Sequence, residues 1–246
     1  MKIAFLFLII NNIYHESCWL NFFKAHENNY TIYIHSKYPM VNSVFKKYEI
    51  PKKVSTTWKN TMRAQIELLK EALKDPLNSK FVFLSESTIP LQAFDYVYQT
   101  LTKHPYSQFN FLPNYNRDRN FKPIPFNKQY KNSQWIVLNR KHAQMMVEDK
   151  SYIKVFDRYG HDQEHYPSTF LINKGLKGEI VKESTTLVIW PHNKNANPHT
   201  FVKLEEDSHL KRLINTIISK KFLFARKFAL QCNLLPLAIY TPELFA

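Results

Sequence analysis

The chain has 246 residues, a formal net charge of +14, 44% hydrophobic residues and 22% charged residues. This length can bury a sizeable core, and the composition excludes an intrinsically disordered chain. The three glycines, Gly160, Gly175 and Gly178, cannot form a glycine-rich phosphate-binding loop at any spacing. Cys18 and Cys232 form no CxxC pair, so we expect neither a structural zinc site nor a disulfide framework, which suits a reducing compartment.

The excess of positive charge favours polyanionic partners: nucleic acid, an anionic membrane surface or a phosphorylated small molecule. The lysines are spread along the chain, so a solvated basic surface accounts for the charge equally well. The apolar run 3–10 is far shorter than the ~20 residues that span a bilayer, and no small-residue cleavage site follows it. We therefore predict a buried first strand, no transmembrane segment and a cytoplasmic location, with peripheral membrane contact left open.

The first half of the chain alternates between strand and helix patterns. In chain order, we predict strand 2–10, helix 18–25, strand 30–36, helix 61–74, strand 81–87 and helix 93–101. The clearest helix pattern is the apolar stripe Met62, Ile66, Leu69 and Leu73. This alternation predicts an α/β fold with a mainly parallel sheet flanked by helices.

The second half is less regular. Residues 105–131 are predicted to form a long surface loop, followed by strand 133–139, helix 140–147, strand 185–190 and helix 209–218. No repeat or flexible linker interrupts the sequence, so we predict a single domain, 1–246. Its nucleotide-binding half would be 1–104, and its acceptor-binding and catalytic half 105–246.

The segment GHDQEHYPSTF, residues 160–170, has three possible interpretations. Asp162 and Glu164 resemble a D-x-D metal clamp, and His161 and His165 have the i, i+4 spacing of a zinc-binding helix, although no third ligand is evident. Alternatively, Asp162 caps a helix that starts there, and Glu164 in its first turn serves as a general base. The third alternative is a polar loop without chemistry.

Several motifs follow one another over nearly the whole chain: KIAFLFL, WLNFFKAHENNYTIYIHS, FVFLSESTIPL, NSQWIVLNRKHA, DQEHYPST, NPHTFVK and LFARKF. In sequence and in order they resemble glycosyltransferase family 14, the core-2/I-branching β-1,6-N-acetylglucosaminyltransferases, and most closely the plant DUF266 branch. The resemblance implies a GT-A-like α/β fold. It also implies inverting, metal-independent transfer of a sugar, GlcNAc or related, from a UDP-sugar to an acceptor hydroxyl of a glycan.

The resemblance also implies roles for individual residues. Glu164 falls on the family's catalytic glutamate, and Lys203 and Lys227 fall on basic positions that neutralise the departing diphosphate, so no metal or other cofactor is expected. Arg226 is assigned to the same diphosphate, although alternation along a strand would point it away from Lys227. The motifs depart from the family at Gln163, where the family has an aspartate, and this leaves Asp162 without a role.

Further candidates have weaker support. The predicted nucleotide and donor pocket comprises Ser36, Lys37, Trp58, Ser85 and Glu86, and the predicted acceptor site comprises Trp190, Arg117 and Arg119. The family often has an aspartate where Ser36 and Lys37 stand. For Trp58 a core position, and for Arg117 and Arg119 simple solvation, are alternative interpretations.

Two other functions remain open at this point. The charge and the aromatic content would suit a nucleic-acid-binding protein, although no known nucleic-acid-binding motif is visible, and we expect no nucleic-acid partner. The substitution at Gln163 would also suit a catalytically inactive, sugar-binding relative.

Overall fold

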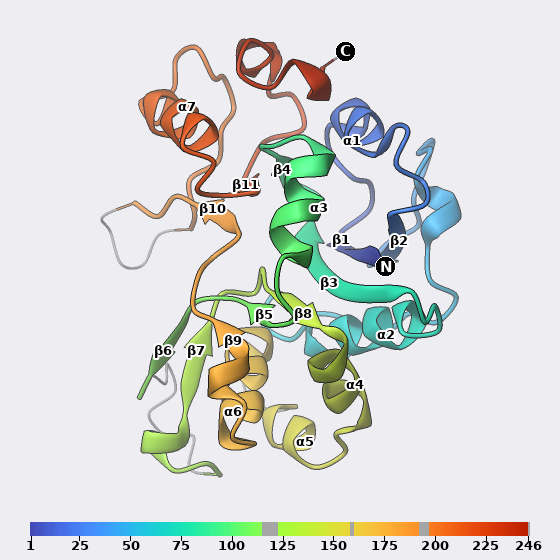
Figure 1. The fold of residues 1–246 in the computed structure, drawn as a ribbon, viewed down its shortest axis with the longest axis vertical. Helices are drawn as coiled ribbons and strands as arrows, with labels where there is room; N and C mark the ends of the chain where they lie inside the picture. The colour runs from blue at the N-terminus through green and yellow to red at the C-terminus, as the bar shows by residue number, and fades with distance from the viewer. Residues whose placement is uncertain (115–122, 158–159, 192–196, 246) are drawn as a thin grey trace.

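The computed structural model describes residues 1–114, 123–157, 160–191 and 197–245 (Figure 1). The strands are β1 (Lys2–Ile9), β2 (Tyr30–Ser36), β3 (Asn78–Ser85), β4 (Ile89–Pro90), β5 (Ser107–Gln108), β6 (Phe111–Pro113), β7 (Tyr130–Asn132), β8 (Val137–Asn139), β9 (Ile180–Val181), β10 (Thr186–Val188) and β11 (Phe224–Arg226). The α-helices are α1 (Glu16–Phe23), α2 (Met62–Ala72), α3 (Phe94–Thr102), α4 (Arg140–Glu148), α5 (Tyr152–Phe156), α6 (Tyr166–Asn173) and α7 (Leu210–Ile218).

The main sheet has six strands in the order β2-β1-β3-β8-β5-β9. Three of its five strand pairs are parallel, β1 with β2, β1 with β3, and β5 with β9, and the two pairs made by β8 are antiparallel. A smaller sheet, β10-β11-β4, lies at one side, and β6 pairs with β7. The expected mainly parallel α/β sheet is confirmed.

Strand β1 is buried on both faces, as its continuous apolar sequence predicts. Ile3, Phe5 and Phe7 face one hydrophobic cluster, whereas Ala4 and Leu6 face the other, which is the two-residue period of a strand. The first cluster lies beneath α1, α3, α7 and the C-terminal turns, and the second beneath α2, α4, α5 and α6 (Figure 1).

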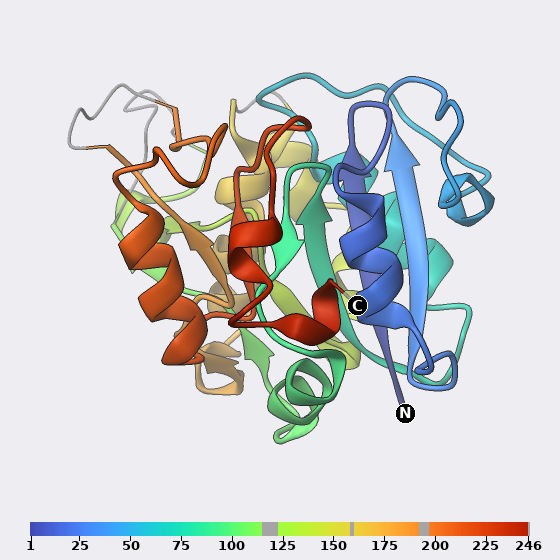
Figure 2. The same cartoon turned by 90° about the horizontal axis from the view of Figure 1, so that it is seen from above.

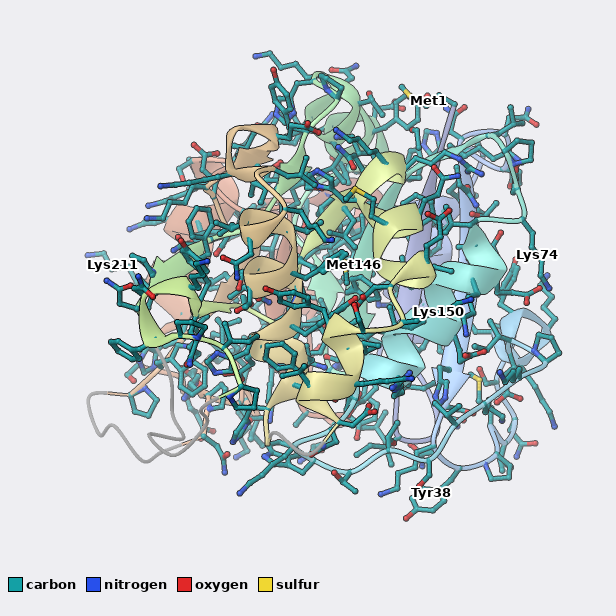
Figure 3. The ribbon with its side chains drawn as sticks, turned by 90° about the horizontal axis from the view of Figure 1, so that it is seen from below. Met1, Tyr38, Lys74, Met146, Lys150 and Lys211 are labelled. Atoms are coloured by element: carbon teal, nitrogen blue, oxygen red, sulfur yellow. The ribbon has the colours of Figure 1, made fainter. Side chains whose placement is uncertain are left out.

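The parallel strands β1, β2 and β3 run in one direction across the molecule. In Figure 3 Met1, before β1, and Tyr38, after β2, are labelled at opposite edges. Figure 2 shows the N-terminus and the C-terminal turns on the side of α1. The carboxyl ends of these strands therefore open together at the Tyr38 edge, where α/β sheets bind their ligands.

Most predicted elements of the first half are present within a few residues of their expected ends. The second half required corrections. Residues 105–131 are not one loop, because β5, β6 and β7 form there. Within the described ranges, no helix combines the length and apolar character needed to cross a membrane.

Candidate active site

A cleft of about 1230 Å³ opens at the carboxyl ends of β1 and β3. Its floor includes Ile9 and Ser85, and β10, β11 and the hairpin β6–β7 contribute to its walls. The predicted residues that line it are Lys37, Trp58, Ser85, Glu86, Glu164, Trp190, Arg226 and Lys227. Residues from six separate stretches of sequence thus meet in one cavity, although their individual roles stay predictions.

The carboxylate of Asp162 holds the segment that carries Glu164 against the start of α2. It accepts hydrogen bonds from the backbone N–H groups of Thr61 at 3.0 Å, Met62 at 3.2 Å and Gln163 at 2.7 Å. These groups of Thr61 and Met62 belong to the N-terminal end of α2, whose N–H groups have no partners within the helix. Asp162 therefore caps a helix 100 residues earlier in the chain, and the expectation that it caps a helix starting at its own position is wrong.

Gln163 completes this connection. With its side-chain amide oriented to satisfy both atoms, the nitrogen donates to the backbone carbonyl of Lys59 at 3.3 Å and to Asp162 Oδ1 at 2.6 Å. An aspartate at position 163 would have no proton to donate and would place a second negative charge beside the buried Asp162. The neutral amide of Gln163 can therefore donate a hydrogen bond to the carboxylate of Asp162, which a second acid at this position could not do.

Glu164 occupies the end of a 3-10 helix, Asp162–Glu164, immediately before α6. Its Oε2 lies 3.3 Å from Lys131 Nζ, and about a fifth of each side chain is exposed, 19% and 20%. Glu164 lines the cleft, whereas Asp162 is turned toward α2 and does not line it. The two carboxylates therefore do not form a D-x-D clamp. His161 and His165 flank the 3-10 helix and are not an i, i+4 pair on one α-helix.

Strand β7 supports the same segment from the other side. Asn132 donates through Nδ2 to the backbone carbonyl of Gln163 at 3.1 Å and accepts through Oδ1 from the Ser168 hydroxyl at 2.7 Å. His165 Nδ1 lies 3.0 Å from the carbonyl oxygen of Tyr130. Because β7 and α2 hold residues 162–168 from two directions, the position of Glu164 is fixed by long-range contacts.

Arg226 is held deep in the cleft by an aromatic ring. Its guanidinium carbon lies 4.2 Å from the centre of the Trp135 ring, a cation–π distance, and its Nε donates to Ser85 Oγ at 3.2 Å. Burial lowers the pKa of Arg226 to about 10, so the side chain remains positively charged at neutral pH. This geometry leaves a fixed positive charge at the cleft, stacked on a tryptophan.

Lys227 adds a second positive charge, and Glu86 an opposing group. The Lys227 ammonium lies 5.2 Å from the centre of the Trp58 ring, and burial together with Arg226 lowers the pKa of this lysine. Burial raises the pKa of Glu86, and the nearby charges of Arg226 and Lys227 partly oppose that change. Two cations and one carboxyl group thus share a partly desolvated region, which is typical of a binding site for an anion.

The expected divergence of Arg226 and Lys227 is wrong. Both line the cleft, because β11 ends at Arg226 and the strand alternation does not extend to Lys227. Lys203 is also not where it was expected. Its side chain is 68% exposed, pairs with Glu206 at 3.1 Å and does not line the cleft.

The remaining predicted site residues, Ser36, Arg117 and Arg119, are not found in the described cleft. Ser36 is buried outside the cleft, where its hydroxyl hydrogen-bonds to Glu49 and accepts from Lys53 at 3.1 Å. The predicted acceptor residues Arg117 and Arg119 lie outside the described residues.

Sequence reasoning missed several residues of the site. Lys131, Asn132 and Arg212 carried no signal in the sequence, because their positions depend on β7 and α7 reaching the cleft. Trp135 is only 7% exposed, and the face of its ring contacts the guanidinium of Arg226.

Comparison with known proteins identifies the family. A family model described as Core-2/I-Branching enzyme matches residues 3–214. The chain belongs to this family. Glycosyltransferase BC10 of Oryza sativa subsp. japonica is 29% identical over 230 residues, which cover 77% of this chain and 57% of BC10. The chain thus spans little more than half the length of this relative.

Two solved structures of a galactosyltransferase show a distant similarity. The galactosyltransferase LgtC in complex with donor and acceptor sugar analogues is 10% identical, with a TM-score of 0.44 over 92% of this chain and 87% of LgtC. An active-site mutant of LgtC has the same TM-score and coverage at 12% identity. These values are too low to carry residue roles from LgtC to this cleft.

The Asp162 cap gives a stability prediction. Asp162→Ala removes the acceptor for buried N–H groups at the start of α2, and we expect the free energy of unfolding to fall by about 2–3 kcal/mol. Asp162→Asn keeps an acceptor oxygen and should cost clearly less. Urea unfolding at neutral pH measures both, and equal losses would contradict the cap.

The same pair reports the charge of Asp162. Burial raises its pKa from 3.8 to about 6, against the effect of the backbone hydrogen bonds. The folded state then binds more protons than the unfolded state between these values, so this carboxyl's contribution to stability falls as the pH rises from about 4 to about 6. We expect the stability advantage of the wild type over Asp162→Asn to shrink across that window, and a constant difference would contradict the raised pKa.

Proposed function

We propose that this cleft transfers a sugar from a UDP-sugar to an acceptor hydroxyl of a glycan, with inversion at the anomeric carbon and without a metal ion. The observation that carries the proposal is that Glu164, Arg226 and Lys227 line the same cleft at the carboxyl ends of β1 and β3. Such a cleft offers a base and two positive charges, which are the groups that this transfer requires. GlcNAc or a related sugar is the donor group that the family suggests.

In the proposed reaction Glu164 is the general base. The acceptor oxygen attacks the anomeric carbon as Glu164 takes the hydroxyl proton, and the bond between that carbon and the diphosphate oxygen breaks. A single displacement of this kind inverts the anomeric configuration. The ammonium group of Lys131, 3.3 Å from Glu164 Oε2, orients the carboxylate.

Arg226 and Lys227 receive the leaving group. The diphosphate departs with both electrons of the broken bond, and preorganised cations stabilise the charge that develops. Together the two side chains supply the charge of one divalent cation, and stacking on Trp135 fixes the Arg226 guanidinium before the donor binds. Lys203 is not part of this proposal, because its side chain is exposed and paired with Glu206.

The ends of the cleft suggest how the two substrates lie. Lys37 follows β2, and Trp58 is 69% exposed at the rim, so we assign this end to the nucleotide, with Trp58 as a stacking surface for the base. Glu86 lies beside the two cations, where the donor sugar would follow the diphosphate. Trp190, 55% exposed on the β10 side, is assigned to the acceptor sugar.

A nucleotide titration tests the binding half of the proposal. UDP should raise the midpoint of thermal unfolding in the presence of EDTA, and GDP and CMP should do so less. Lys227→Met keeps the side-chain length but removes the charge, so we expect UDP affinity to fall by about tenfold to hundredfold. Isothermal titration calorimetry measures this change.

Lys203→Met is the matched control and should leave the affinity nearly unchanged. An equal loss in both variants would show that Lys203 reaches the ligand. Tight, salt-sensitive binding of RNA without any binding of UDP would favour a nucleic-acid-binding protein instead.

Removal of the base tests the catalytic half. Glu164→Gln keeps the shape of the side chain but cannot accept the proton, so we expect kcat for sugar transfer to fall by about 10²–10⁴-fold with UDP affinity retained. UDP release assays with a panel of glycan acceptors measure the rate. A variant that retains more than half of the wild-type rate would remove Glu164 from this role.

A further inference from the structure

A second cluster of side chains that could bind a ligand lies apart from Glu164, Arg226 and Lys227. His199, Asp207 and His209 come together at the start of α7, and their potential metal-binding atoms all lie within 4.8 Å of one another. His199 Nε2 lies 2.7 Å from Asp207 Oδ2, and His209 Nδ1 lies 3.4 Å from Asp207 Oδ1. In Figure 3 Lys211, two residues after His209, is labelled at the edge of the molecule.

We propose that these three residues bind a divalent transition-metal ion of the zinc type, with solvent as a fourth ligand. Two imidazoles and one carboxylate form a donor set that zinc accepts, whereas magnesium and calcium prefer oxygen ligands throughout. The two cysteines of the chain gave no reason to expect a structural zinc site. The site proposed here has histidine and aspartate ligands and uses no cysteine.

The geometry requires only small changes. Bonds of about 2.0–2.1 Å at tetrahedral angles place zinc ligands about 3.4 Å apart. The 3.4 Å separation of His209 Nδ1 and Asp207 Oδ1 already has this value. His199 Nε2 hydrogen-bonds to the other carboxylate oxygen, Oδ2, at 2.7 Å, and this hydrogen bond must break when both groups bind one ion. The three donor atoms already lie within 4.8 Å of one another, so the remaining movement is small.

The surroundings provide both rigidity and access. The Asp207 side chain is 9% exposed, and its Oδ1 accepts from the backbone N–H of His209 at 2.8 Å, which fixes the carboxylate. The His199 and His209 side chains are 25% and 34% exposed, which leaves a path for an ion from solvent. Metal binding would replace the hydrogen bond between His199 Nε2 and Asp207 Oδ2.

The position of the cluster suggests what the ion would do. The backbone N–H of His199 donates to the backbone carbonyl of Ile189 at 2.8 Å, and the backbone carbonyl of His199 accepts from the backbone N–H of Lys227 at 3.4 Å. Asn197 and Pro198, just before His199, line the cleft. A bound ion would therefore tie α7 to the wall of the cleft between Trp190 and Lys227, and would stabilise the fold without contacting the reacting atoms.

Metal binding can be measured without any enzyme assay. The full chain is treated with a chelator, dialysed and titrated with Zn²⁺, and we expect about one ion per chain and a rise of about 5–10 °C in the unfolding midpoint at 100 times Kd. Mg²⁺ should produce no such rise. Co²⁺ bound at the same site should show visible d–d absorption of a four-coordinate ion.

His209→Gln removes one ligand from a partly exposed position and should abolish the shift and the Co²⁺ spectrum, and His199→Gln should do the same. His26→Gln is the matched control, because His26 also lies beside a carboxylate, 3.6 Å from Asp95, but belongs to no three-ligand cluster among the described residues. That variant should bind zinc as the wild type does.

The proposal would be overturned if the wild type bound no Zn²⁺, or if His209→Gln and His199→Gln bound it unchanged. Neither result bears on sugar transfer, because the measurement contains no nucleotide. Conversely, a loss of UDP binding in Lys227→Met would leave this metal site untouched.

Discussion

The placement of the proposed base, Glu164, depends on hydrogen bonds to the carboxylate of Asp162. This carboxylate accepts hydrogen bonds from the first backbone N–H groups of α2 and from its own neighbour Gln163. These bonds attach a short 3-10 helix to the central α/β core, and Glu164 is the last residue of that helix. A base must lie within hydrogen-bond distance of the proton it takes, so a carboxylate on an unsupported loop would be a poor one. Asp162 supports the segment on which the proposed base, Glu164, stands.

A second constraint is the distribution of charge in the cleft. Arg226 is desolvated, but stacking on Trp135 and the hydrogen bond to Ser85 hold it in place. Lys227 and Glu86 share the same region, and burial opposes the charged form of each. An anion bound there would relieve the mutual repulsion of the two cations. The cleft thus has an excess of partly buried positive charge, and the proposed binding of a diphosphate without a metal depends on it.

The sequence predicted the fold well where local patterns determine it. The continuous apolar run of β1, the β2 strand and the stripe along α2 are local signals, and each element formed close to its expected bounds. Residues 105–131 were misjudged because β5 to β7 are only two or three residues long, too short to give a clear strand pattern. In addition, β5 pairs with β8 and β9 outside this stretch, whereas β6 and β7 pair with each other.

Only part of the candidate site could be predicted from the sequence. Motif resemblance identified Glu164 and Lys227, and both line the cleft. It could not distinguish Lys203, whose exposed side chain pairs with Glu206, from a cation inside the cleft. The roles of Asp162 and Gln163 also required the structure, because their partners lie about 100 residues away on α2 and in the segment before it.

The most direct test of this account is a crystal structure of the protein with UDP, grown in the presence of a chelator. The account predicts diphosphate oxygens within hydrogen-bond distance of Arg226 and Lys227, with no metal ion between them, and the Glu164 carboxylate open to the space where the acceptor hydroxyl would lie. A diphosphate bound away from these two side chains, or UDP that binds only when a divalent ion is supplied, would contradict it.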